Sequence, residues 1–226
     1  MPFLPLGRLF WKFLAFFFLA QATAVIGFLN GCLIFDRRVN RGAIYIFYTK
    51  GALHVPATLW KLVFIFVCLV MAGKNRLMVH GAGIKRRRGG GGYLFLGRSG
   101  AGKSTIAALS PGEIVLSDDA PVIEAGEGGF RIHATPFTQT GIDRQRPKRW
   151  SLQKERLQRI VFLHQADGTW MAPRERHYAC MELLTDHVHC YGLMEAALKR
   201  RTFDLCHRLC GVVPAADLYF RRDGGF

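Results

Sequence analysis

A glycine-rich loop between a predicted strand and a predicted helix constrains the fold of this chain more than any other feature. Residues 93–96 (YLFL) form an apolar run that is typical of a buried strand. The next residues, 97–104 (GRSGAGKS), match the GxxxxGK[ST] pattern of a phosphate-binding P-loop. Residues 105–109 (TIAAL) predict a helix, which residues 110–112 (SPG) would end. The motif therefore lies between a strand and a helix, as its mechanism requires.

Each position of this loop has a physical role in binding phosphate. Glycines allow the backbone to curl so that successive N–H groups face one anion, beside the positive end of the helix dipole. Lys103 is expected to reach the β- and γ-phosphates of ATP, and the Ser104 hydroxyl is expected to bind Mg²⁺. The predicted nucleotide-binding residues are Gly97, Arg98, Ser99, Gly100, Ala101, Gly102, Lys103, Ser104 and Thr105.

Two adjacent acids follow the next predicted strand. Residues 114–116 (IVL) are apolar, and Asp118 and Asp119 come just after them. A Walker B aspartate, which holds Mg²⁺, usually ends a strand in this way. A second carboxylate can take a proton from an attacking hydroxyl. The alternative for this pair is an Asx turn before the next strand.

Taken together, these motifs resemble those of HPr kinase/phosphorylase and its relatives, which are phosphoenolpyruvate carboxykinase-like P-loop proteins. The resemblance rests on His80-Gly81, residues 97–105 (GRSGAGKST) and residues 112–119 (GEIVLSDD). Residues 134–137 (ATPF) also resemble the G-T-P-[FW] turn of small HPr-kinase-like proteins found beside peptide-modification genes. The resemblance covers the chain from about residue 59 to its end.

The chain departs from the family pattern at several positions. Thr105 stands where HPr kinases often carry Glu, Glu113 replaces a His, and Ala134 replaces a Gly. The glycine-rich signature with which HPr kinases bind their protein substrate is not recognisable. The resemblance therefore implies an ATP site, but it implies neither HPr as the substrate nor phosphorylase activity.

The resemblance implies an α/β fold with α+β character, in which an HPr kinase C-terminal-like core follows an apolar N-terminal segment. It implies ATP-dependent phosphorylation of a Ser or Thr hydroxyl on a peptide or protein. The candidate catalytic residues are Asp118 as base, Lys103 and His80, while Ser104 and Asp119 would hold Mg²⁺. The reverse roles of the two aspartates stay open, as does a purely structural role for His80 at a strand end. The alternative function is a non-catalytic nucleotide-binding accessory protein of a peptide-maturation system, attached to a membrane.

The N-terminal segment is apolar from Leu9 to Leu29, except for Lys12, Gln21 and Thr23. Its length and composition suit a buried or membrane-surface helix, a membrane anchor or a signal peptide. Because ATP is a cytoplasmic substrate, we expect a cytoplasmic protein, with membrane contact through residues 9–29 left open. The predicted domains are residues 1–55, which include a strand at 43–48, and the ATP-binding domain at 56–226.

The remaining patterns predict ordinary elements. Pro56 would begin a helix at 57–72 that Gly73 ends, and residues 85–92 (KRRRGGGG) predict a hairpin tip rather than a nucleic-acid or lipid patch. The basic stretch 144–159 could bind phosphates or an acidic peptide, or form a solvated loop and helix face. Further strands are predicted at 122–125, 130–133, 160–163 and 214–220, and helices at 181–184, 193–198 and 203–209. His177, His187 and His189 are expected to be ordinary polar residues.

Charge and cysteine content limit the function classes further. The chain has 31 Lys and Arg against 16 Asp and Glu, a formal net charge of +15, so an anionic partner is expected. No nucleic-acid module is recognisable, and we expect no nucleic-acid partner. Six cysteines without a CxxC pair do not suggest a secreted disulfide framework, and core packing is favoured over zinc binding near Cys206 and Cys210. A homo-oligomer stays open.

Overall fold

The computed structural model describes residues 17–20, 23–28, 31–36, 38, 41–46, 55–87, 89–108, 114–137 and 153–221. These residues form a mixed α/β protein. The chain divides into two compact units, Met1–Lys74 and Asn75–Phe226, and each is described by itself. The division follows helix α2 (Val55–Gly73), whereas we predicted it at residue 55.

The first unit contains an antiparallel sheet and helix α2. The sheet has four strands in the order β1 (Phe17–Ala20), β2 (Thr23–Phe28), β3 (Gly31–Asp36) and β4 (Arg41–Ile46). Helix α2 packs on β3, where the rings of Phe35 and Phe66 meet edge to face with centroids 5.6 Å apart. A Cβ atom at Gly42 would lie 2.9 Å from the Phe66 ring, so glycine permits this close approach.

The apolar N-terminal segment forms strands where we predicted a helix. Residues 17–20 and 23–28 pair as an antiparallel hairpin, so the helix interpretation is wrong for these residues; the rest of 9–29 lies outside the described residues. An apolar run without helical periodicity suits either structure. The β-branched and aromatic residues of this run and pairing with β3 favour strands. Among the described residues, we find no helix with the length and hydropathy needed to cross a membrane.

Helix α2 confirms the prediction made from Pro56 and Gly73, within two residues at its beginning and one at its end. Leu62, Ile65 and Leu69 recur at helical spacing and are buried, which is the pattern of a core-facing stripe.

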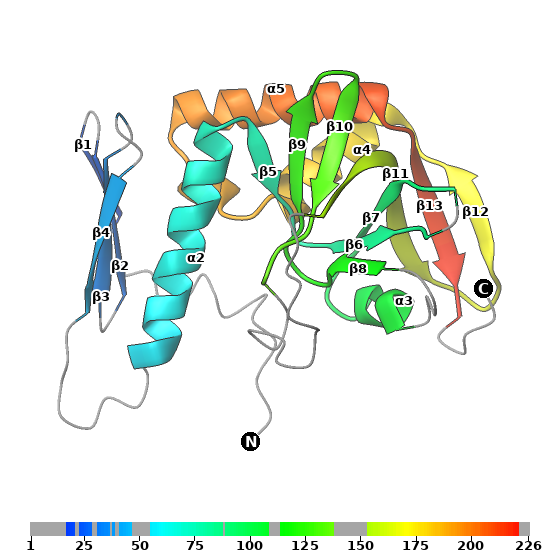
Figure 1. Ribbon diagram of the computed structural model, residues 1–226, viewed down its shortest axis with the longest axis horizontal. Helices are drawn as coiled ribbons and strands as arrows, with labels where there is room; N and C mark the ends of the chain where they lie inside the picture. The colour runs from blue at the N-terminus through cyan, green and yellow to red at the C-terminus, as the bar shows by residue number, and fades with distance from the viewer. Residues whose placement is uncertain are drawn as a thin grey trace. The chain divides into compact units, whose positions relative to one another are not determined.

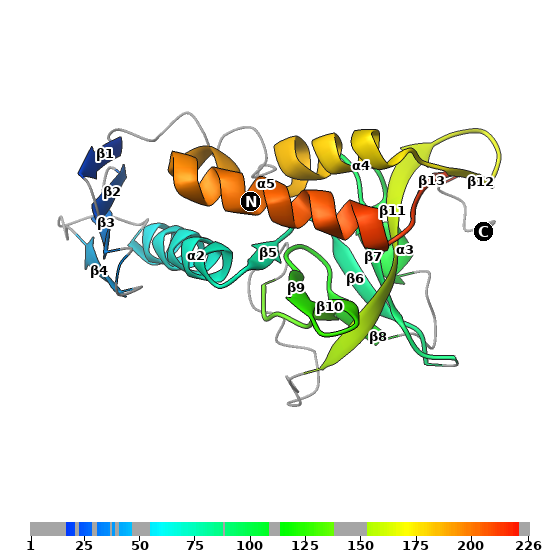
Figure 2. The same ribbon diagram turned by 90° about the horizontal axis from the view of Figure 1, so that it is seen from above.

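The second unit is built on a curled nine-stranded sheet. Its main path runs through β5 (Arg76–Met78), β9 (Val122–Gly126), β10 (Gly129–His133), β11 (Lys154–Gln165), β7 (Gly92–Leu96), β6 (Ala82–Lys85) and β8 (Ile114–Ser117). Strand β13 (Ala215–Phe220) also pairs with β11, and β12 (Trp170–Pro173) pairs with β13. Strand β11 is parallel to β7 and β13, and its long curved path is visible in Figure 2.

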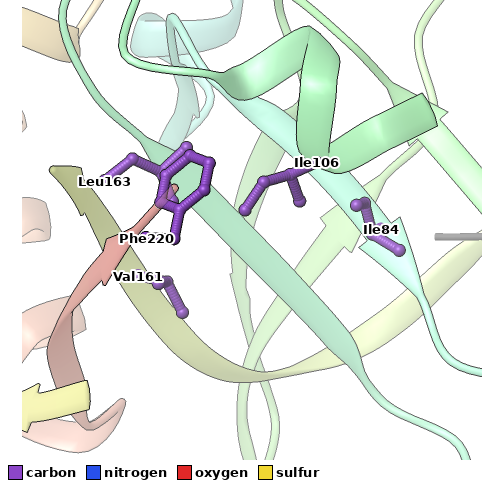
Figure 3. Close-up of a cluster of buried hydrophobic side chains, with 5 residues drawn as sticks. All are labelled: Ile84, Ile106, Val161, Leu163 and Phe220. Atoms are coloured by element: carbon purple, nitrogen blue, oxygen red, sulfur yellow. The ribbon is translucent and has the colours of Figure 1, made fainter. Parts of the chain in front are cut away.

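Helices cover both faces of this sheet. The short helix α3 (Lys103–Ala108) lies on one side, and α4 (Arg176–Glu182) and α5 (Ala196–Val212) lie on the other (Figure 1). A buried cluster under α3 joins side chains from three strands and from α3 itself (Figure 3): Ile84, Ile106, Val161, Leu163 and Phe220. Because side chains alternate along a strand, Phe162 of β11 faces the opposite side, where the His187 ring lies 6.2 Å away.

Most of the predicted elements of this unit are present. The hairpin tip at 85–92 joins antiparallel strands β6 and β7, and the strands predicted near 114, 122, 130, 160 and 214 form. The helix face predicted up to residue 159 is wrong for 154–159, because these residues pair with β10 and β7 as part of β11; residues 144–152 lie outside the described residues. The helix predicted at 193–198 begins only at Ala196.

Candidate functional site

The glycine-rich loop lies between strand β7 and helix α3, as predicted. The backbone φ angles of Gly100 and Gly102 are +83° and +109°, a region that side-chain-bearing residues rarely adopt. A Cβ atom at Gly102 would also lie 2.5 Å from the Phe220 ring. The loop curls back on itself through a hydrogen bond of 3.0 Å from the Ala101 N–H to the Arg98 carbonyl. Positive φ angles and the absence of side chains at Gly100 and Gly102 therefore shape this loop.

Lys103 begins helix α3 and points into the loop. Only 4% of the residue is exposed, and its Nζ atom donates hydrogen bonds to the carbonyl oxygens of Gly97 at 2.6 Å and Arg98 at 3.2 Å. Burial lowers the pKa of Lys103, and the negative charge of Asp119 opposes that effect. The Lys103 ammonium is therefore fixed at the loop by hydrogen bonds, and the negative charge of Asp119 also acts on it.

The remaining residues of the motif surround this lysine. Arg98, Ser99, Gly100 and Ser104 are exposed, whereas Ala101, Gly102 and Thr105 are half-buried. The side-chain amide of Gln165, at the end of β11, donates a hydrogen bond to the Gly100 carbonyl and ties the loop to the sheet. Gln165 was not predicted from the sequence, because it is 65 positions away in the chain.

The acid pair follows β8, as predicted, and buried hydroxyl groups hold its turn. The Ser117 hydroxyl accepts a hydrogen bond from the Ala120 N–H at 3.0 Å and donates one to the Phe137 carbonyl at 3.1 Å. The Thr135 hydroxyl bonds to the Ala120 carbonyl at 2.8 Å. The turn at 134–137, recognised from its resemblance to the G-T-P-[FW] motif, therefore supports the loop that carries Asp118 and Asp119. Both aspartates are half-buried.

His80 meets Asp119 directly. Its Nδ1 atom lies 3.2 Å from Oδ1 of Asp119, and the N–H of Gly81 donates to the Asp119 carbonyl at 3.0 Å. Burial alone would raise the pKa of Asp119. The hydrogen bond from His80 and the electrostatic interactions with His80, His189 and Lys103 outweigh burial, so the pKa of Asp119 lies below its usual value. The structure therefore brings together three predicted residues, His80, Lys103 and Asp119.

Two further histidines lie at this site, and the sequence analysis assigned them no role. The ring of His189 packs edge to face on the ring of His80, with centroids 5.5 Å apart. Burial and the charge of His80 lower the pKa of His189 to about 4, although Asp119 opposes this shift. His187 forms two hydrogen bonds with the backbone of His80, one with its N–H group and one with its carbonyl oxygen. The only local signal for these residues is the alternating His-x-His pattern, which is too common to identify a site.

The donor set at the loop fits a nucleotide with Mg²⁺. Mg²⁺ usually takes one or two protein ligands and completes its shell with phosphate oxygens and waters. Ser104 has an exposed hydroxyl and Asp119 a half-buried carboxylate, the two kinds of oxygen ligand that would hold Mg²⁺. Within the described ranges, no group of three or more His, Cys, Asp or Glu residues is arranged to hold a metal ion by itself.

The cysteines on helices α4 and α5 belong to the core. Cys180, Cys206 and Cys210 are buried between α4 and α5. Burial raises the pKa of Cys206 well above its usual value and that of Cys210 to about 12. These groups are therefore protonated thiols that pack as small apolar residues, which agrees with the favoured interpretation.

Comparison with known families extends this description. The family described as SynChlorMet cassette protein ScmC matches residues 54–210, which is more than half of the chain. The matched region contains the glycine-rich loop, the acid pair and the three histidines at the site. No curated protein is similar enough to count as a match. The chain therefore belongs to the family of the SynChlorMet cassette protein ScmC.

Proposed function

We propose that this protein is an ATP-dependent kinase that phosphorylates a Ser or Thr hydroxyl of a peptide or protein. One observation carries the proposal: His80 contacts Asp119 of the acid pair at 3.2 Å, and the charge of Asp119 acts on the buried Lys103 of the glycine-rich loop. The proposal is supported because a loop with the P-loop pattern, an acid pair and a histidine belong to neighbouring parts of the same unit.

Each part of the site has a role in this reaction. The N–H groups of the loop and the Lys103 ammonium bind the β- and γ-phosphates of ATP, and Ser104 and Asp119 hold Mg²⁺. When bound, Mg²⁺ neutralises the charge that develops on the phosphate oxygens. The acceptor oxygen forms a bond to the γ-phosphorus while the bond to ADP breaks, and Asp118 takes the proton of the acceptor hydroxyl.

The surroundings of Asp119 favour this division of roles between the aspartates. A metal ligand must stay anionic, whereas an effective base needs a pKa near the working pH. The hydrogen bond from His80 and the charge of Lys103 favour the charged form of Asp119. His80 then orients the Asp119 carboxylate through the contact at 3.2 Å. Asp118, the other member of the pair, is therefore the base that takes the proton of the acceptor hydroxyl.

A nucleotide-binding accessory protein without phosphotransfer is the second candidate. The separate N-terminal unit, with its own sheet and helix, favours it. In such a protein, binding of the nucleotide would control the N-terminal unit, and no phosphate would be transferred. The proposed kinase uses both aspartates, whereas a binding protein needs only the one that holds the metal.

Incubation of the full chain with γ-labelled ATP and the peptides encoded by neighbouring genes tests the kinase proposal. We expect mass spectrometry to find one phosphate on a Ser or Thr of a peptide, and Asp118→Asn to abolish this transfer. Binding of ATP with no transfer to any hydroxyl would favour the accessory protein. Absence of ATP binding would exclude both functions.

A further inference from the structure

An irregular segment after helix α4 brings a buried histidine to the back of His80. Residues Leu183–His187 form a single turn of π-helix, a feature that is frequent at functional sites. His187 ends this turn and is 2% exposed. Val188 then bridges to Val79, and the His189 N–H donates to the Met78 carbonyl at 2.9 Å. The segment therefore runs against the residues that precede and include His80.

His187 holds the backbone of His80 with two hydrogen bonds. The N–H of His80 donates to the His187 carbonyl at 2.7 Å. The ring of His187 reaches back, and its Nδ1 atom lies 3.1 Å from the His80 carbonyl oxygen. Because a carbonyl oxygen only accepts, Nδ1 must carry the hydrogen and donate it. Both polar groups of the His80 backbone are thus occupied by one residue.

The other side of the His187 ring faces Glu182, at a distance longer than a hydrogen bond. Its Nε2 atom lies 3.6 Å from Oε1 of Glu182. The His187 ring and the charge of Arg174 lower the pKa of Glu182, against the effect of burial. Arg174 also bonds to Oε2 of Glu182 and, at 2.6 Å, to Asp217.

Arg174 is in turn fixed by the sheet. Its guanidinium lies 4.1 Å from the ring centroid of Phe162, a buried residue of β11. The chain of contacts therefore leads from the centre of the sheet through Arg174, Glu182 and His187 to the backbone of His80. The partners of Arg174 lie on β11, β13 and α4, so three elements fix this arginine behind His187.

We propose that His187 is a positioning residue, which fixes the backbone of His80 so that the His80 ring stays against Asp119. This inference rests on the proposed function for its effect on catalysis, because His80 acts there by orienting Asp119. Its structural part stands alone. The contact between His80 and Asp119 is 3.2 Å long, and a backbone shift of about 1 Å would break it, since hydrogen bonds weaken beyond about 3.2 Å.

Three variants separate positioning from general support of the fold. His187→Leu removes the ring donor, whereas His187→Asn places an amide N–H close to where Nδ1 lies. His177→Leu makes the same change at an exposed residue of α4 and is the matched control. Circular dichroism and thermal unfolding show which variants fold. If His187→Leu does not fold, Glu182→Gln takes its place in every comparison.

The first readout is the NMR signal of the His80 ring, assigned by its loss in His80→Gln and recorded without nucleotide. We expect His187→Leu to shift or broaden this signal, His187→Asn to restore it towards its wild-type position, and His177→Leu to leave it unchanged. An unchanged His80 signal in a folded His187→Leu protein would overturn the proposal. This measurement needs no enzyme activity, so its outcome does not depend on the proposed function.

The second readout is turnover. We expect His187→Leu to lower kcat by about 10- to 100-fold, as for outer partners of a catalytic group, with the KM for ATP within about twofold of wild type. His187→Asn should recover most of kcat. A kcat equal to wild type in a folded His187→Leu protein would also overturn the proposal. A shifted His80 signal in a protein that transfers no phosphate would instead keep the positioning role and reject the kinase function.

Discussion

The ammonium group of Lys103 is hydrogen-bonded to the carbonyl oxygen of Gly97, 2.6 Å away, so the lysine near the end of the loop motif bonds back to its first residue. The same group interacts with Asp119, which follows strand β8. Lys103 therefore links the loop to the acid pair before any phosphate is bound. Binding of a nucleotide would exchange carbonyl oxygens for phosphate oxygens, which carry more negative charge.

Lys103→Ala is expected to weaken Mg·ATP binding at least about 30-fold, because removing one partner of a buried charge pair costs about 2 kcal/mol or more. The fold should stay intact, since the hydrogen bonds of the lysine to described residues go to Gly97 and Arg98 of its own loop. Isothermal titration calorimetry measures the affinity, and circular dichroism checks the fold. Lys154→Ala, the same change at an exposed residue of β11, is the control and should bind ATP as wild type does. Equal affinity in Lys103→Ala would exclude the P-loop interpretation.

Gly102→Ala tests the shape of the loop. The φ angle of Gly102 is +109°, and a Cβ atom would lie 2.5 Å from the Phe220 ring. Backbone strain and overpacking together should lower the free energy of unfolding by about 2 kcal/mol or more and weaken ATP binding. At Gly126 the nearest atom to an added Cβ is 4.0 Å away. Gly126→Ala should therefore change stability by less than about 0.5 kcal/mol. Urea unfolding gives both values, and similar losses in the two variants would contradict the steric argument.

The pH dependence of stability should contain a contribution from His133. Burial lowers the pKa of His133 below 6.5, and the neighbouring carboxylate of Glu124, 2.8 Å away, opposes this shift. Below pH 6.5 the unfolded chain therefore binds a proton before the folded protein does, and the free energy of unfolding falls as the pH falls. His133→Gln should remove this part of the acid sensitivity. Urea unfolding between pH 8 and pH 5 measures it, and parallel curves for wild type and His133→Gln would show that His133 contributes nothing.

Every candidate site residue belongs to the second unit, Asn75–Phe226, which has its own buried core. A shortened chain that begins at Asn75 is therefore expected to fold and to bind ATP within about threefold of the full chain, a difference of about 0.6 kcal/mol. Circular dichroism and calorimetry measure both properties. If this shortened chain does not fold, the second unit needs the first unit for its stability, and the expectation of an independent nucleotide site is wrong.

The features that the sequence predicts well are those encoded by neighbouring residues. The strand, loop and helix around Lys103, the acid pair after β8 and the hairpin at 85–92 all depend on short patterns, and the structure contains each of them. Residues 17–20 and 23–28 were misread because an apolar run suits a helix or a strand until a partner strand is known. The supporting role of His187 depends on a contact across 107 positions of the chain, which no local pattern reveals.

Exchange of the two aspartates for asparagine distinguishes a kinase from a protein that only binds nucleotide. A general base contributes about 10²–10⁴ in rate and little to ground-state binding, whereas a metal ligand affects both. Because Asp119 contacts His80 at 3.2 Å and interacts with Lys103, Asp119→Asn is expected to weaken Mg²⁺-dependent ATP binding as well as transfer. Asp118→Asn should bind ATP normally and lose at least about 100-fold in transfer rate. Calorimetry with and without Mg²⁺ and transfer of labelled phosphate measure the two effects. Swapped phenotypes would exchange the roles of the two aspartates. If wild type and both variants transfer no phosphate, and the variants differ from wild type only in ATP affinity, the protein is the nucleotide-binding accessory protein instead.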